Sequence, residues 1–285
     1  MKLNTSFLHT LAFAGLTLGC GSVGSVNASI WGEAYIEQEI PAITPMNDEG
    51  FENGWTIRFT KFLVHMGGLT IAAADGTTGG SLPALKVYDL HTLRGPLAIG
   101  ALDGLEARRF DRISYRLAPV NAQSTAGNAT AADLALMRTG GYSIYVEGNG
   151  TRAGLATPVT FRWGFTNTVS YANCHSTETE VGVAVPSGGS VRAQITVHGD
   201  HLFYDDLQSP DAKLRFDLIA GADMDRNNEV TMDELARVDL TTAPMGQYGT
   251  GPFGNTVRNL REFITVLVAT VGHFNGEGHC DETRM

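Results

Sequence analysis

The segment Val159-Thr160-Phe161-Arg162-Trp163-Gly164-Phe165 decides the fold class, because large apolar residues occupy every second position in it. A period of two places these apolar side chains on one face of a β-strand. The same alternation recurs in the segments 55–60, 62–66, 113–117, 142–146 and 191–197. The spacing favours antiparallel pairing. It predicts a mainly β protein with a β-sandwich-like body of two sheet layers.

The apolar residues change phase within the segment 55–66. Trp55, Ile57 and Phe59 are followed by Phe62, which starts a second apolar set of opposite parity. One extra residue in a strand produces such a change, so we predict a β-bulge near Lys61.

The composition supports this fold class and limits the partners. The chain has 285 residues, 34 of them glycine, and a formal net charge of −10. Abundant glycine beside strand-forming residues is typical of many short strands joined by turns. The negative charge argues against a nucleic-acid partner, because phosphate binding requires basic patches. It favours cations as partners instead.

The segment Asp223-Met224-Asp225-Arg226-Asn227-Asn228-Glu229-Val230-Thr231-Met232-Asp233-Glu234 has the oxygen-ligand spacing of a calcium loop. It resembles an EF-hand loop, in which oxygens wind around a hard divalent cation. The resemblance implies that side chains supply most ligands, that Glu229 supplies its backbone carbonyl, and that the terminal glutamate supplies two oxygens. The implied ligand residues are Asp223, Asp225, Asn227, Glu229, Thr231 and Glu234.

The loop departs from the EF-hand pattern at its sixth position, where Asn228 replaces the usual glycine. Asparagine tolerates the left-handed backbone conformation better than most side chains do, so the resemblance survives. No second loop of this spacing occurs in the chain, which indicates a fixed calcium site rather than a sensor. The alternative interpretation is a solvated acidic turn before a helix.

Apolar residues at helical spacing predict a C-terminal amphipathic helix over residues 256–271. They are Leu260, Phe263, Ile264, Leu267, Val268 and Val271. Gly272 follows as the expected residue after the helix end.

Residues 1–19 are typical of a signal peptide, because Lys2 precedes an apolar run too short to span a bilayer. The segment Leu16-Thr17-Leu18-Gly19-Cys20 resembles a bacterial lipobox, which implies lipidation of Cys20. The alternative is cleavage after Ala28, at an ordinary small-residue site. Either cut predicts an exported protein, in the periplasm or anchored as an outer-membrane lipoprotein.

Residues 20–30 are rich in glycine and serine and predict a tether without regular structure. No later stretch has the composition of a linker, so residues 31–285 are expected to form a single β-rich domain.

Two cysteines remain beyond the N-terminal segment, Cys174 and Cys280. In an oxidising compartment such a pair normally forms a disulfide. The alternative is a metal site, because His175 follows the first cysteine and His279 precedes the second.

Histidines concentrate in the second half of the chain and form a candidate copper or zinc site. Its members are His175, His198, His201, His273 and His279. Neutral imidazoles bind both metals, and a shared ion requires ligand nitrogens within about 4 Å of one another. The alternative interpretation is that each histidine makes a hydrogen bond in a loop or at a strand end.

Motifs of catalysis are missing from the sequence. The chain has no nucleophile elbow, no H-E-x-x-H, no P-loop and no glycine-rich dinucleotide turn. We therefore do not expect an enzyme. A metal-dependent hydrolase is the alternative, and it would need an open coordination position on a bound ion.

Over most of its length the chain is similar to a group of bacterial lipoproteins. The similarity rests on the segments 31–37, 54–59, 196–201 and 272–280, and it implies export without implying an activity. In architecture alone the chain resembles secreted copper-binding β-sandwich proteins of metal-uptake systems. The first hypothesis is therefore a calcium-binding surface module on a lipid anchor. The second is a copper- or zinc-binding lipoprotein that delivers metal to an outer-membrane transporter.

Overall fold

Strands dominate the computed structural model, which describes residues 22–177 and 179–285. Strands hold 43% of the residues and helices 18%, so the prediction of a mainly β protein is confirmed. The predicted signal peptide, residues 1–19, and the lipidation residue Cys20 lie outside the described residues.

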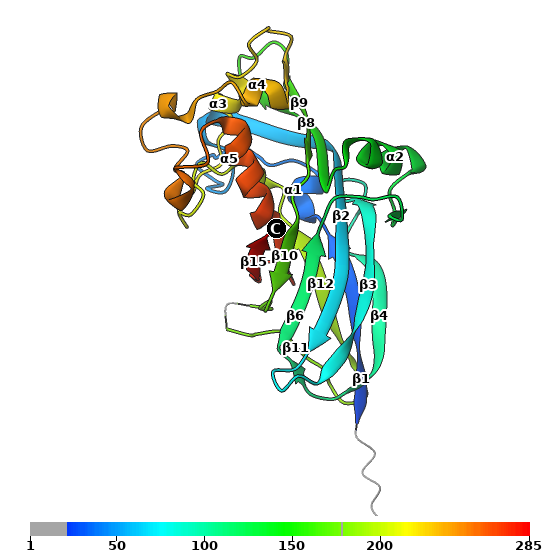
Figure 1. Cartoon of the computed structure of the whole chain (residues 1–285). Coiled ribbons are helices and arrows are strands. Elements are labelled where there is room, and N and C mark those ends of the chain that lie inside the picture. The colour runs from blue at the N-terminus through cyan, green and yellow to red at the C-terminus, as the bar shows by residue number, and fades with distance from the viewer. Residues whose placement is uncertain (1–21, 178) are drawn as a thin grey trace, which may run out of the picture.

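The strands form two larger sheets and one small one (Figure 1). The first sheet has the order β14 (Gly272–Phe274), β12 (Ser190–Val197), β1 (Val23–Trp31) and β4 (Leu97–Glu106). The second has the order β13 (Glu229–Val230), β9 (Val159–Phe165), β8 (Ile144–Arg152), β2 (Trp55–Ala72), β6 (Arg112–Leu117), β10 (Val169–Ala172) and β15 (Asp281–Arg284), with β3 (Thr78–Asp89) on β2 and β7 (Thr125–Ala126) on β3. The small sheet pairs β11 (Val183–Ala184) with β5 (Arg109–Phe110).

Strand β2 runs the length of the second sheet and has different neighbours along its course. Its first half pairs with β8, and its second half pairs with β3 and β6. The pairing with β8 shifts register between Phe59 and Lys61, which confirms the bulge predicted near Lys61. The alternation that defines β9 also holds, because Val159, Phe161, Trp163 and Phe165 are all buried.

The prediction of a tether over residues 20–30 is wrong from Val23 onward. Strand β1 occupies Val23–Trp31 and lies between β12 and β4 in the first sheet. Its side chains Val26 and Ile30 are fully buried, and Ala28 is 2% exposed. The strand is paired on both edges and buried on one face, and both depend on strands that are distant in sequence.

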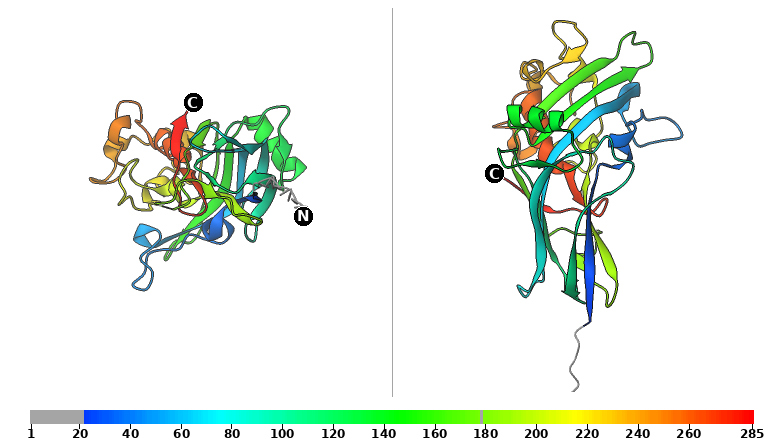
Figure 2. Two further views of the ribbon diagram at one scale, coloured as in Figure 1. Left: turned by 90° about the horizontal axis from the view of Figure 1, so that it is seen from below. Right: turned by 90° about the vertical axis from the view of Figure 1, so that its right-hand side faces the viewer.

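The buried faces of the two larger sheets share one hydrophobic core. Ile30 of β1 and Ile195 of β12 belong to the same buried cluster as Ile71 of β2 and Ile113 of β6. The right-hand view of Figure 2 shows β1 (blue) in one layer and β2 and β3 (cyan) in the other. The pairing is mixed rather than purely antiparallel, because β1–β12, β3–β7 and β9–β13 are parallel.

Short helices cover the ends and edges of the sheets. The α-helices are α1 (Glu33–Glu37), α2 (Ala131–Gly140), α3 (Asp217–Ala220), α4 (Met232–Leu235) and α5 (Leu260–Leu267), and the 3-10 helices are η1 (Glu52–Gly54), η2 (Asp200–Phe203), η3 (Leu240–Thr242), η4 (Gly251–Phe253) and η5 (Val268–Val271). None of the helices in the described part of the chain is long and apolar enough to cross a membrane.

The C-terminal helix starts later than the predicted span of 256–271. Helix α5 begins at Leu260, and η5 continues it to Val271. Residues 256–259 are not helical, because the side chain of Asn259 caps the helix by accepting a hydrogen bond from the backbone N–H of Glu262. The apolar face of α5 packs into the core, with Phe263 fully buried.

Candidate metal centres

The loop 223–234 is fixed to the edge of the second sheet. Strand β13 pairs in parallel with β9, and Val230 is fully buried. The indole N–H of Trp163 donates to the carbonyl oxygen of Val230 at 2.9 Å, and the Thr160 backbone N–H donates to the carbonyl of Asn228 at 2.8 Å. The second half of the loop is therefore held by the body of the protein.

The first half of the loop makes the sharp turn that the EF-hand resemblance requires. Asn228 has a φ of 62°, the left-handed conformation that glycine normally supplies at this position. Its backbone N–H donates to one carboxylate oxygen of Asp223 at 2.9 Å, and the N–H of Asn227 donates to the other at 3.1 Å. The chain thus wraps around the first carboxylate.

Three carboxylates converge inside the loop. Asp223, Asp225 and Glu234 each place an oxygen within 4.8 Å of the others. Asp225 is exposed at the turn, whereas Glu234 is only 6% exposed. Three like charges so close together repel one another unless a cation lies between them.

Glu234 joins the loop to the helix that follows. Thr231 and Glu234 form a capping box at the start of α4, and the Met224 N–H donates to Glu234 Oε1 at 3.2 Å. Burial acts to raise the pKa of Glu234, but the hydrogen bonds from Thr231, Met224 and Asp225 outweigh it and lower the pKa. The carboxylate is therefore ionised and aimed into the loop.

The other implied calcium ligands lie in the same loop. The Asn227 side-chain oxygen accepts from the backbone N–H of Glu229 at 2.7 Å. The carboxylate of Glu229 faces outward to Arg162 at 3.0 Å, which agrees with a ligand role for its backbone carbonyl alone. The hydroxyl of Thr231 is engaged in the capping box with Glu234.

Three of the five candidate histidines form a compact group in which each offers a ring nitrogen within 4.8 Å of the others. His198 follows β12, His201 lies in η2 and His273 lies in β14. The ring centroids are 4.1 Å apart for His198 and His273, 4.9 Å for His201 and His273, and 5.3 Å for His198 and His201. The upper bound of 4.8 Å on the distances between the ring nitrogens exceeds the 4 Å predicted for a shared ion by less than about an ångström.

The hydrogen bonds around His201 select its tautomer. Its Nδ1 lies 3.0 Å from the hydroxyl oxygen of Thr270, and that hydroxyl donates its one proton to the carbonyl of Leu267 at 2.9 Å. Thr270 therefore accepts from Nδ1–H, which leaves the lone pair on Nε2 of His201 available. A second residue that orients a histidine in this way is typical of metal ligands.

His273 has a buried nitrogen without a partner. The side chain is 4% exposed, and its Nδ1 has no hydrogen-bond partner among the residues that the structure describes. Burial lowers the pKa of His273 to about 2, with further lowering from His198, His201 and His279. Burial likewise lowers the pKa of His201 to about 4, against a raising effect from Asp200. Both rings are neutral at ordinary pH, which is the form that binds metal.

A pocket of about 360 Å³ opens over His198 and His201. Its lining includes one basic residue, Lys213, and five acidic residues: Glu33, Asp48, Glu49, Asp200 and Glu277. An acidic rim around a concave site raises the local concentration of cations.

Glu33 is held against the histidines in an unusual backbone conformation. It starts α1 with a φ of 57°, and its Oε1 lies 3.7 Å from Nε2 of His198. Burial raises the pKa of Glu33, His198 lowers it, and Glu277 and Asp200 raise it further. Glu33, His198 and Glu277 also bring ligand atoms within 4.8 Å of one another, so His198 belongs to both groups.

The two remaining histidines are not part of the compact group. His279 is exposed, with its ring centroid 4.9 Å from that of His273. His175 contributes its backbone N–H, which donates to the carbonyl of His279 at 2.8 Å, and it belongs to neither group of ligand atoms found in the described residues.

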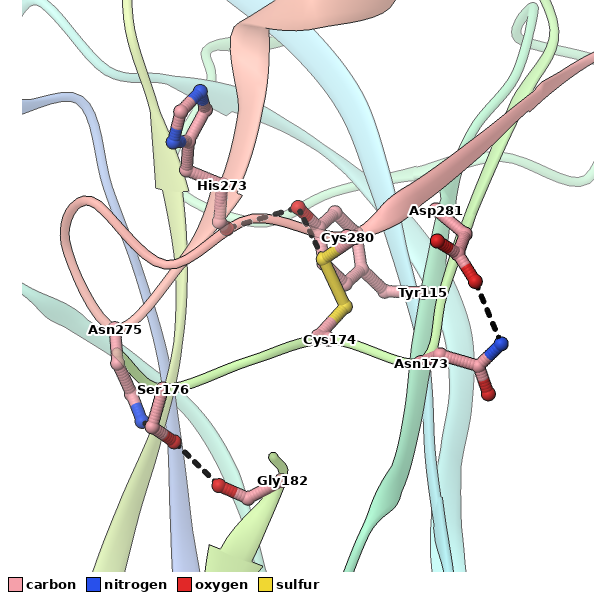
Figure 3. The surroundings of a disulfide bond; sticks show 9 residues. All are labelled: Tyr115, Asn173, Cys174, Ser176, Gly182, His273, Asn275, Cys280 and Asp281. Atoms are coloured by element: carbon pink, nitrogen blue, oxygen red, sulfur yellow. Dashed lines mark hydrogen bonds between the residues drawn. A yellow bond between two sulfur atoms is a disulfide. The ribbon is translucent and has the colours of Figure 1, made fainter. Parts of the chain in front are cut away.

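The sulfur atoms of Cys174 and Cys280 form a disulfide, as predicted, with their Cα atoms 4.0 Å apart (Figure 3). The bond ties the end of the chain to the loop after β10, and the side chain of Asn173 donates to Asp281 beside it at 2.8 Å. The alternative in which these cysteines bind a metal is excluded in this oxidised state, because their sulfurs are bonded to each other.

A larger pocket, of about 910 Å³, lies between β9, α4 and α5. Its lining contains no histidine, and its side chains include Tyr145, Arg162 and Arg261. None of the residues of the convergent ligand groups lines this pocket, whereas His198, His201, Glu33 and Glu277 line the pocket of about 360 Å³.

The chain matches no protein-family model, no curated protein and no solved structure.

Two residues at the histidine group carry no signal in the sequence. Glu33 and Thr270 meet the histidines only through the fold, and neither lies in a motif with metal-ligand spacing. The motif that contains His198 and His201 also contains Asp200, which accepts a hydrogen bond from Tyr204 at 3.3 Å and lines the pocket.

Proposed function

We propose that the protein is an exported, lipid-anchored calcium-binding protein, and that the loop 223–234 is its calcium site. The convergence of the Asp223, Asp225 and Glu234 carboxylates carries this proposal. Calcium prefers six to eight oxygens in a flexible arrangement, and the loop supplies carboxylate, amide and carbonyl oxygens without nitrogen or sulfur.

The ion would connect two parts of the protein. Asp223 follows α3, and Glu234 lies in α4, so an ion bound to both would hold the turn against the helix. The loop sits at the edge of the second sheet through β13, so its ordering would stabilise that edge. This arrangement favours a structural calcium site that supports a binding or surface module.

The lipid anchor is supported by the position of β1. Cleavage after Ala28 would remove Val26 and Ala28, which are buried in the core. Cleavage before Cys20 leaves β1 complete. In Figure 1, β1 begins at the end of the molecule opposite α3 and α4, so an anchor at Cys20 would leave the calcium loop far from the membrane.

Calcium binding is tested by thermal and urea unfolding with calcium or with chelator. At a free calcium concentration about a hundredfold above Kd, the free energy of unfolding should rise by about 2.7 kcal/mol through mass action. For an exported single loop we expect a Kd on the order of 10⁻⁴–10⁻³ M.

Matched variants identify the site. Asp223→Ala removes a charged ligand, and Glu234→Gln removes a charge while glutamine can still complete the capping box. Both should abolish most of the calcium-dependent gain. Asp233→Ala is the control, because that side chain is 84% exposed and lies outside the ligand set. Equal melting temperatures with calcium and with chelator would refute the proposal.

The anchor is tested separately in a bacterial host. The wild-type protein should partition into detergent, and Cys20→Ser should release it into the aqueous phase. A mature protein that begins at Ser29 would disprove both the anchor and the argument from β1.

A further inference from the structure

We infer that His198, His201 and His273 form a second metal site, which takes one divalent transition-metal ion of the copper(II) or zinc(II) class. The site is distinct from the calcium loop and does not depend on it. Three imidazoles with ring nitrogens within 4.8 Å of one another come from β14, η2 and the residue after β12. His198 and His201 are close in sequence, but His273 joins them from β14, far along the chain, so the convergence depends on the fold.

The ligand chemistry selects this class of ion. Imidazole nitrogens suit zinc and copper, whereas calcium and magnesium prefer oxygen. The disulfide removes both thiolates from consideration, so the site offers nitrogen and carboxylate ligands alone. Copper(II) should bind more tightly than zinc(II), following the general order of divalent affinities.

Two of the imidazoles are prepared for binding. Nδ1 of His273 is buried and has no hydrogen-bond partner within residues 22–177 and 179–285, a condition that native structures rarely leave uncompensated. Nε2 of His201 has its lone pair free, because Thr270 holds the proton on Nδ1. An ion bound through Nδ1 of His273 and Nε2 of His201 would satisfy both nitrogens.

The site has an open side. His198 and His201 line the pocket together with Glu33 and Glu277. Three protein ligands with access to a pocket leave a coordination position for a carboxylate, water or an exchangeable ligand. The acidic residues that line the pocket attract cations toward the histidines.

Glu33 is the side chain placed to take that position. Its left-handed backbone, with φ of 57°, costs free energy that a non-glycine residue seldom carries without compensation. The conformation brings its Oε1 to 3.7 Å from Nε2 of His198. We therefore assign Glu33 to the edge of the metal site, as a ligand or as the group that receives the ion first.

The test uses the mature protein, stripped with chelator and returned to buffer with calcium. Copper(II) chloride or zinc(II) chloride is titrated alone, binding is followed by calorimetry, and the bound metal is counted by elemental analysis. We expect one ion per chain. Paramagnetic resonance of the copper-loaded wild-type protein should show coupling to imidazole nitrogens, a readout that requires no variant.

Variants then locate the ion. His201→Asn should weaken copper binding more than about a hundredfold. Thr270→Val keeps His201 as a ligand but removes the hydroxyl that orients its ring, and it should weaken binding by about 10–100-fold. His175→Asn is the matched control and should leave affinity unchanged, because His175 lies outside the group. Glu234→Gln should also leave it unchanged, which separates this site from the calcium loop.

Absence of nitrogen coupling in the copper-loaded protein would overturn the inference. It is equally overturned if His175→Asn weakens binding as much as His201→Asn does, or if neither copper(II) nor zinc(II) binds to the stripped protein.

Discussion

The imidazole rings of His198 and His273 lie 4.1 Å apart between centroids because β12 and β14 are antiparallel neighbours. His273 pairs with Thr196, and His198 is two residues further along, so both point to the same face as a diagonal pair. The backbone N–H of His198 donates to the carbonyl of Val271 at 2.9 Å, which fixes this register. The two rings therefore meet through strand pairing and do not depend on the mobility of a loop.

His273→Phe should stabilise the metal-free protein. A buried polar group without a partner costs about 1–3 kcal/mol, and phenylalanine fills similar space without that group. We expect the free energy of unfolding to rise by about 1 kcal/mol in urea at neutral pH, while copper binding is lost. His65→Phe is the comparison. His65 is also buried, and its Nε2 likewise has no partner among the described residues, but its Nδ1 bonds the carbonyl of Ala118 at 2.8 Å. That variant loses a hydrogen bond, so it should be less stable than His273→Phe. Destabilisation by His273→Phe would show that Nδ1 has a partner in solution.

The metal-free protein should lose stability as pH falls from about 6.5 to about 4. Burial lowers the pKa of His201 to about 4, with Asp200 raising it and His198 and His279 lowering it. A group with a depressed folded pKa binds more protons when unfolded, so its contribution is complete above the unfolded pKa and disappears as pH falls to the folded one. His273 extends the same trend to lower pH, because its pKa is lowered to about 2.

Urea unfolding across this range measures the effect. One histidine shifted this far contributes up to about 3 kcal/mol at neutral pH. His201→Asn cannot titrate, so its stability should change less between pH 6.5 and 4 than that of the wild type. Parallel pH profiles for the two proteins would mean that His201 protonates in the folded state as readily as in the unfolded chain.

The parts of the fold that sequence could predict are those with a local signal. Alternation identified β9, and the change of phase at Lys61 identified the bulge in β2. Strand β1 was missed because Val23–Trp31 contains mostly small residues, and its burial comes from pairing with β12 in parallel, far along the chain. The start of α5 was placed too early, because the cap at Asn259 outweighs the periodicity before it.

The candidate sites also differ in how much of each is visible in the sequence. The calcium loop is contiguous, so its ligand spacing is visible in the sequence. The sequence also shows the five candidate histidines, but it does not show which of them converge. His198, His201 and His273 converge through the β12–β14 register and η2, whereas His175 presents only its backbone to the neighbouring segment. Thr270 acquires its role from the packing of η5 beside η2.

Asn228→Gly should stabilise the calcium loop, and Asn228→Val should destabilise it. Asn228 has a φ of 62°, which glycine adopts without strain and a β-branched residue adopts at a cost of about 1–2 kcal/mol or more. The valine variant should therefore melt lower and bind calcium more weakly, while the glycine variant should bind at least as well as wild type. Calorimetric titration with calcium checks whether the affinity decreases in the order glycine, asparagine, valine at position 228. Equal affinities for all three would indicate that the turn is not part of the binding conformation.

The disulfide should control stability without controlling the histidine site. The cysteines are 106 positions apart, and closing a loop of that length stabilises by about 4–5 kcal/mol in the chain-entropy model. We expect the double variant Cys174→Ser, Cys280→Ser to lose a large part of that stability in urea, since β15 is also released from its pairing with β10.

Copper affinity should nevertheless survive in the double variant below its unfolding transition. His198 and His273 are held by the β12–β14 register and by the hydrogen bond to Val271. Both contacts involve residues that precede Cys280, so they do not require the disulfide. His279, which directly precedes Cys280, is the histidine that the bond positions, and its ring lies 4.9 Å from that of His273. Calorimetric titration of the metal-free double variant with copper(II) shows whether His279 is a ligand. Retained affinity assigns the ion to His198, His201 and His273, whereas a loss as large as that of His201→Asn would place His279 among the ligands.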